Sequence, residues 1–133
     1  MLAKAEEIGE VLYNRGLIGA MLGVEGIRKA QEKFGKMPLT GGQVRWGLEN
    51  LDLNEARLKE LGFEGMIRPV KVSCADHEGG RTARIQQWDG SAWKVISDWY
   101  TADETVTEPI VKEFSAKYAA ATNITPRDCS KEN

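Results

Sequence analysis

The segment 74–78, with the sequence CADHE, brings together the most reactive side chains of this chain. Cys74 and the single histidine, His77, stand three positions apart, with Asp76 and Glu78 beside them. A thiolate next to an imidazole is the pairing of a nucleophile with its general base. Thiolate, imidazole and carboxylate groups are also zinc ligands. The residue types therefore raise two chemistries, a cysteine nucleophile and a metal site.

The spacing of these residues argues against both chemistries. Consecutive loop residues seldom converge on one ion, and no second cluster in the sequence supplies further ligands. A nucleophile also needs an orienting residue and oxyanion donors, which no pattern in the sequence provides. We therefore interpret 74–78 as a solvated loop that follows a strand cysteine. We expect no catalytic residue, no metal and no cofactor.

Two further patterns contain groups that could bind a ligand. Four tryptophans could stack on a sugar or a base, although large aromatic residues on strands usually pack against their neighbours, and packing is the favoured interpretation. They are Trp46, Trp88, Trp93 and Trp99. Tyr13, Asn14 and Arg15 place hydrogen-bonding groups inside an otherwise apolar stretch, where a helix could present them to a cleft. From spacing alone, we favour an exposed turn for these three residues.

Length and composition limit the classes of protein to which the chain can belong. Its 133 residues suffice for one domain core at most. A formal net charge of −2, with 41% hydrophobic and 29% charged residues, describes a soluble globular protein without the basic excess of a nucleic-acid-binding protein. No run approaches the ~20 apolar residues of a membrane span, and the first twelve residues lack the pattern of a signal peptide.

Helix-favouring residues dominate 5–62, and the long helix predicted over 5–34 has two distinct stripes. One stripe is apolar and lies on a single face of the helix: Leu17, Met21, Val24 and Ile27. A second stripe predicts another backbone packed very close: Gly16, Gly19, Gly23 and Gly26. Two shorter helices are predicted next. Thr40 and Gln43 form a capping-box pattern before a helix over 41–51, and Asn54 is the cap of a helix that ends near Gly62.

The periodicity changes to alternation in 66–100, which predicts three antiparallel strands. Two of them form a hairpin over 81–100 with its turn at Asp89 and Gly90. An amphipathic helix over 107–121, with Pro109 tolerable in a first turn, is followed by an irregular tail over 122–133. Three or four helices with a small antiparallel sheet predict an α+β fold, with no strand–helix–strand unit.

The succession of these segments strongly resembles the carboxy-terminal portion of a known family. That family is the bacterial extracellular solute-binding proteins of the branched-chain amino-acid type, which are type I periplasmic binding proteins. The similarity runs from about Gly9 to Cys129 and rests on four stretches in order: YNRGLIGAMLGVEGIRKA, PLTGGQVRWGLENL, DHEGGRTARIQQWDGSAWKVISDW and VTEPIVKEFSAKYAA.

The resemblance implies that 1–133 is a fragment of an α/β protein with two lobes. Such a protein is the non-catalytic solute-binding component of an ABC importer. It closes on a small amino-acid-like, carboxylate or amide ligand and then engages the membrane permease subunits. The intact protein would lie in the periplasm or on the outer face of the membrane. Exposed apolar faces of the fragment would be covered by self-association, as a dimer or a swapped assembly.

The resemblance also implies roles for particular residues. The segment before the glycine-rich helix lies near the ligand cleft in the family, so Tyr13, Asn14 and Arg15 become candidate ligand contacts. An oxidising compartment makes a disulfide between Cys74 and Cys129 an expectation. The main alternative is a ligand-sensing domain of a receptor or transcriptional regulator, because one architecture can serve both functions. A small enzyme that uses Cys74 and His77 is the third reading.

Overall fold

The computed structural model describes residues 8–131, and they fall into two units, one that ends at Gly80 and one that begins at Arg81. The first unit contains α1 (Val11–Phe34), α2 (Gly41–Leu48), β1 (Asp52–Leu53), α3 (Glu55–Glu60) and β2 (Val70–Lys71). The second contains β3 (Thr82–Ala83), β4 (Gln86–Trp88), β5 (Trp93–Val95), β6 (Tyr100–Thr101), α4 (Glu104–Thr122) and the 3-10 turn η2 (Cys129–Lys131). The described residues therefore form a small α+β structure with short antiparallel strands.

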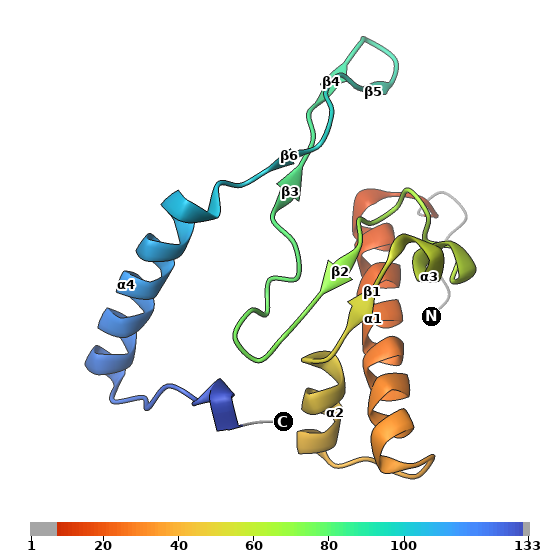
Figure 1. The fold of residues 1–133 in the computed structure, drawn as a ribbon. Coiled ribbons are helices and arrows are strands. Elements are labelled where there is room, and N and C mark those ends of the chain that lie inside the picture. The colour runs from red at the N-terminus through yellow and green to blue at the C-terminus, as the bar shows by residue number, and fades with distance from the viewer. Residues whose placement is uncertain (1–7, 132–133) are drawn as a thin grey trace. The chain divides into compact units, whose positions relative to one another are not determined.

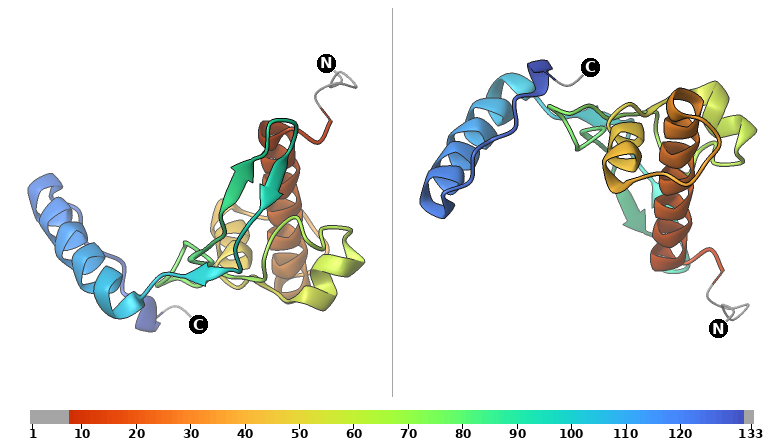
Figure 2. Two further views of the ribbon diagram at one scale, coloured as in Figure 1. Left: turned by 90° about the horizontal axis from the view of Figure 1, so that it is seen from above. Right: turned by 90° about the horizontal axis from the view of Figure 1, so that it is seen from below.

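The first unit is built around the contact between α1 and α2, which lie side by side in Figures 1 and 2. Two glycines make this contact close. A Cβ added at Gly47 would lie 2.0 Å from the carbonyl oxygen of Gly26, and one added at Gly26 would lie 2.5 Å from Leu48. Near the end of α1, Phe34 packs edge-on against Trp46 with ring centroids 5.4 Å apart. Glycine at both helix surfaces lets the two backbones approach.

The hydrophobic core of the first unit lies where α1 meets α3 and the β1–β2 pair. Its buried members are Met21, Leu51, Leu53 and Leu58. Strands β1 and β2 are antiparallel, with Leu53 opposite Val70. Strand β1 was not predicted, and β2 pairs with it rather than with the hairpin. Both differences arise because the partner of a strand is set by packing between distant segments, which alternation in one segment does not specify.

The apolar stripe predicted on α1 is largely exposed. Met21 is buried, but Leu17, Val24 and Ile27 are 40%, 62% and 42% exposed. The buried face of α1 is instead formed by Met21, Glu25, Gly26 and Ala30. The helix has apolar residues on two sides, and periodicity alone cannot tell which side meets the core.

Several helix boundaries follow from local caps. Thr40 and Gln43 form the predicted capping box, in which the Thr40 hydroxyl accepts from the Gln43 amide and the Gln43 side chain accepts from the Thr40 amide. The Asn54 side chain caps α3 by accepting from the amide of Arg57 at 2.9 Å. Helix α2 ends at Leu48, before the predicted 51, because the chain turns there into β1. The predicted start of the first helix at residue 5 lies outside the described residues.

The second unit consists of a two-stranded ribbon and a helix. Strands β4 and β5 pair with Trp88 opposite Trp93, and β3 and β6 continue the ribbon with Ala83 opposite Tyr100. The turn is closed by the Asp89 carboxylate, which accepts from the amides of Ser91 and Ala92 at 2.8 Å each. The predicted hairpin is thus present, although its two strand pairs are separate.

Helix α4 begins at Glu104, three residues before the predicted position. Asp103 is its N-cap, and the carboxylate accepts from the Thr105 amide at 3.0 Å. Pro109 consequently lies beyond the first turn, inside the helix. The end of α4 is marked by Asn123, whose φ of 55° places it in the left-handed region that terminates helices.

Candidate functional site

Tyr13, Asn14 and Arg15 occupy the first turn of α1. The Asn14 side chain donates to the carbonyl oxygen of Gly9 at 2.9 Å, which ties the helix start to the preceding residues. Arg15 is exposed, and Tyr13 is partly exposed. Three consecutive helical residues point about 100° apart, so their side chains do not converge on one small ligand. A ligand contact by these residues stays a prediction, and the contact that the structure gives Asn14 is local.

The loop that contains 74–78 is organised by its own side chains. The Ser73 hydroxyl accepts from the Asp76 amide at 3.1 Å, and the Asp76 carboxylate accepts from the Glu78 amide at 3.0 Å. His77 reaches outside the loop. Its Nε2 lies 3.1 Å from Oε1 of the buried Glu49, which is the C-cap of α2. The histidine therefore anchors the loop to the end of α2, and its ring is not paired with Cys74.

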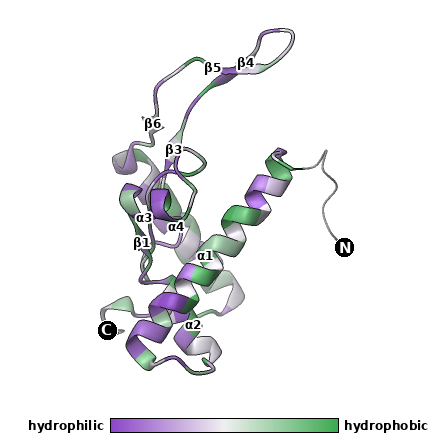
Figure 3. Cartoon of the chain, turned by 90° about the vertical axis from the view of Figure 1, so that its right-hand side faces the viewer, coloured by the Kyte–Doolittle hydropathy of each residue, from purple (hydrophilic) through white to green (hydrophobic). Residues whose placement is uncertain are grey.

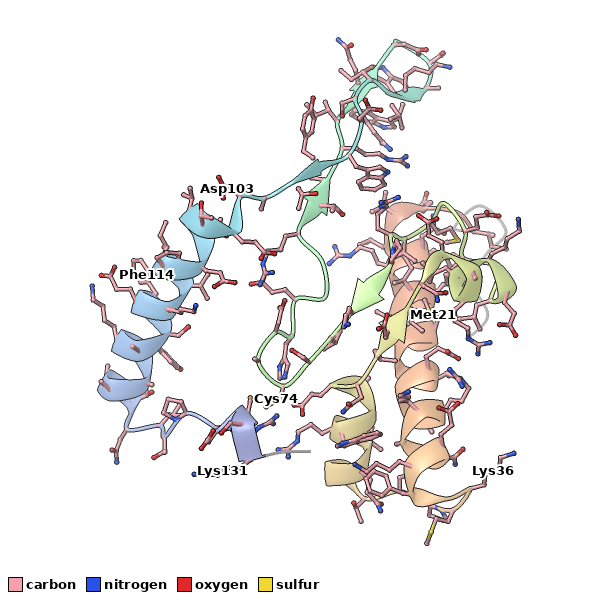
Figure 4. The ribbon with its side chains drawn as sticks, viewed as in Figure 1. Met21, Lys36, Cys74, Asp103, Phe114 and Lys131 are labelled. Carbon is pink, nitrogen blue, oxygen red and sulfur yellow. The ribbon has the colours of Figure 1, made fainter. Side chains whose placement is uncertain are left out.

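Within residues 8–131, Cys74 and Cys129 are both disulfide-bonded, so neither is a free thiol. Cys74 is labelled in Figure 4. A disulfide sulfur carries no thiolate, which is the nucleophilic and metal-binding form. In the same described part of the chain, no group of three or more His, Cys, Asp or Glu side chains is arranged to hold a metal ion. In this state, Cys74 is neither the nucleophile nor the ligand that its sequence neighbours suggested.

The most strongly interacting charged group of the chain is one that the sequence did not single out. Glu25 lies on the buried face of α1, with its side chain 2% exposed, and accepts hydrogen bonds from two arginines. Arg57 of α3 donates through Nε to Oε2 at 2.9 Å and through Nη2 to Oε1 at 2.8 Å, a bidentate arrangement. Arg28, one turn further along α1, donates through Nη2 to Oε2 at 2.9 Å.

Electrostatics at this cluster favour the charged carboxylate. The hydrogen bonds from Arg57 lower the pKa of Glu25 from 4.5 to about 2, against the opposing effect of burial and with further help from Arg28. The same hydrogen bonds raise the pKa of Arg57 above its ordinary value. Both carboxylate oxygens are occupied by guanidinium donors, so Glu25 is an anion at neutral and mildly acidic pH. The cluster acts as a clamp between α1 and α3, and its chemistry suits neither proton transfer nor ligand binding.

One sequence signal could have found this clamp. Glu25 stands four residues after Met21, a member of the apolar stripe predicted on this helix, so the two side chains are neighbours on the helix surface. A carboxylate there requires a cationic partner. That partner, Arg57, lies 32 residues further along the chain, so spacing could not identify it.

Aromatic residues of the ribbon are exposed and pair across the strands. Trp88 and Trp93 lie 5.7 Å apart between ring centroids at a tilt of 59°, and the Arg84 guanidinium lies 4.7 Å from the ring centroid of Trp99. These contacts agree with cross-strand packing, the favoured interpretation from the sequence. Trp46 belongs to the α1–α2 contact of the first unit.

Among residues 8–131, none of the helices combines the length and the apolar character that crossing a bilayer requires.

Comparison with known proteins adds one informative match. No protein-family model matches the chain, and no curated protein does either. The chain is similar to the crystal structure of an ABC transporter permease from the Pseudomonas fluorescens group, with 48% sequence identity and a TM-score of 0.87. The match covers 96% of this chain and 31% of the other, so this chain spans about a third of that protein's length.

This match corrects the expectation drawn from the order of segments. A solute-binding component of an importer was expected, and the similar protein is instead an ABC transporter permease. The receptor or regulator alternative gains no support from it. The relationship to ABC transporters is supported, while solute binding and amino-acid transport are not. The physical reason for the error is that a succession of helices and strands reflects a fold, and one fold serves several functions.

Proposed function

We propose that this chain is a portion of an ABC transporter, related to the permease of the Pseudomonas fluorescens group, and that it acts by contact between polypeptides rather than by catalysis. The observation that carries the proposal is 48% identity over 96% of the chain. At this level of identity the two proteins share a structure over the matched length. What the permease transports is not carried over to this chain.

The contacts of the reactive residues support a non-catalytic role. Cys74 is disulfide-bonded, and His77 is directed to Glu49. Glu25 is saturated by two arginines and holds its charge down to strongly acidic pH. Cys74, His77 and Glu25 are thus each engaged in a structural contact rather than poised for acid–base or nucleophilic chemistry.

The disulfide-bonded state of Cys74 and Cys129 favours an oxidising compartment for this segment. Disulfides persist in oxidising environments such as the bacterial periplasm and the cell surface, and they are rare in the cytosol. We therefore propose that the segment lies on the oxidising side of the membrane. Labelling of intact cells with a maleimide that does not cross membranes, before and after addition of a reductant that does not cross them either, tests this location. Labelling only after the reductant is expected, and the absence of labelling in both cases would contradict the location.

The transporter assignment can be tested with a chimera. In a bacterium of the Pseudomonas fluorescens group, the matched third of the permease is replaced by this chain, and the chimera is purified from detergent-solubilised membranes. We expect the purified chimera to show Mg-ATP hydrolysis activity, as the natural permease does in a parallel preparation. A permease with the third deleted is the control. The assignment fails if the chimera is folded and carries no ATPase activity while the natural permease does.

A further inference from the structure

Helix α4 has an apolar face that no described residue covers. Ile110, Val111, Phe114 and Tyr118 recur at the spacing of one helix face and are 51%, 53%, 65% and 64% exposed. Figure 4 shows the labelled Phe114 on this helix. Opposite this face, Glu108 pairs with Lys112. We call these four residues the α4 face.

The second unit as a whole has no interior. No residue between 81 and 131 is buried, and α4 buries none of its own residues. Most of the stability of a protein helix comes from packing of its apolar face, and a two-stranded ribbon alone is marginal in water. An apolar face on such a unit indicates a packing partner outside that unit.

Helix α1 of the first unit carries a second uncovered face. Leu17, Val24 and Ile27 lie on the side of α1 away from the core, and Figure 3 shows hydrophobic residues along this helix. We call these three residues the α1 outer face. A Cβ added at Gly16 or Gly23, beside this face, would meet nothing within 4 Å. Helix-interior glycine costs about 1 kcal/mol relative to alanine, so a close backbone partner would explain both glycines.

The length of the similar permease identifies the occupant. The same elements recur there, within a chain of which they make up only 31%. Roughly two thirds of that protein has no counterpart in this chain. We propose that the α1 outer face and the α4 face are docking surfaces for polypeptide equivalent to that unmatched portion. The proposal shares its relative with the proposed function, but it requires no transport activity.

Hydroxyl-radical footprinting of the chimera and of the isolated chain tests this directly. In the chimera, Phe114, Tyr118 and Val24 should be oxidised roughly fivefold more slowly than in the isolated chain, because burial removes most of a side chain's accessible area. Lys112 of α4, whose side chain is 76% exposed and lies opposite the α4 face, is the matched control and should change little. Equal oxidation of the face residues in both proteins would overturn the proposal.

Substitutions provide a second readout. Phe114→Asp and Val24→Asp should lower the yield of folded chimera at least several-fold, whereas Lys112→Asp should not. In the isolated chain all three should leave the circular dichroism spectrum unchanged, because the side chains are already exposed. A chimera that fails to fold with the unsubstituted chain would count against docking, because faces that fit should allow the exchange.

Three outcomes distinguish between the possible occupants and between the two proposals. Protection in the isolated chain that increases with its concentration, with a dimer in light scattering, would overturn the proposal in favour of a second copy. A folded chimera with protected faces but no ATPase activity would contradict the transporter assignment alone. A chimera with ATPase activity and unprotected faces would contradict docking alone.

Discussion

Glu25 is the residue at which a single substitution should test the core most sharply. Its carboxylate accepts from Arg28 and from Arg57 while 2% exposed. Loss of one partner of a buried ion pair leaves the other charges without compensation, so Glu25→Gln should lower the free energy of unfolding by about 3 kcal/mol. Chemical denaturation monitored by circular dichroism measures this.

The matched control is Glu32→Gln on the same helix. Glu32 also pairs with Arg28, but its side chain is 51% exposed, so its substitution should cost less than about 1 kcal/mol. Equal losses for the two variants would show that the Glu25 clamp contributes no more than a surface ion pair.

The clamp also predicts a dependence of stability on pH. The pKa of Glu25 is about 2 in the folded state against an ordinary 4.5, so its contribution is complete above pH 4.5 and is lost as the pH falls toward 2. As the pH falls from 4.5 to 2, the free energy of unfolding of the unsubstituted protein should therefore decrease by about 3 kcal/mol more than that of the Glu25→Gln variant. Denaturation curves of both proteins at pH 6, 4 and 2.5 give the comparison. Parallel pH profiles would contradict the lowered pKa.

At the scale of elements, the α1–α2 contact depends on glycine. A Cβ at Gly47 would lie 2.0 Å from the Gly26 carbonyl oxygen and 2.9 Å from the Ala30 side chain, so Gly47→Ala must separate the helices. We expect a loss of about 1–3 kcal/mol, as in overpacked cores. Thermal unfolding measures it.

Gly42→Ala in the same helix is the control for this prediction. Its added Cβ meets nothing within 4 Å, and alanine favours helix, so stability should stay the same or rise by up to about 1 kcal/mol. A Gly47→Ala protein as stable as Gly42→Ala would rule out a backbone contact at this position.

The starts of α2 and α3 were predictable because their causes are local, whereas the Asp103 cap of α4 was missed. The Thr40 capping box and the Asn54 cap each involve residues three apart, and the structure contains both. The faces of α1 and the partner of β2 were not predictable, because they depend on segments far along the chain. Leu53 opposite Val70 is a pairing of this kind.

At the scale of the whole molecule, the pairing of the two cysteines stays a prediction. Peptide mapping without reductant should recover Cys74 linked to Cys129, the pairing implied by the family resemblance. Cys129→Ser should then lower the free energy of unfolding by up to about 4 kcal/mol, the chain-entropy value for a loop of this length. Ser130→Ala, next to it, is the control. Recovery of disulfide-linked dimers instead would contradict the intramolecular pairing.

The amino-acid pattern alone specified what neighbouring residues decide: the helix caps, the hairpin turn at Asp89, and apolar stripes on α1 and α4. Folding in three dimensions decided which stripe of α1 is buried, that Arg57 pairs with Glu25, and that β1 pairs with β2. The division has a physical cause. Caps and turns involve groups within a few residues of each other, whereas burial and ion pairing depend on which distant segments come together.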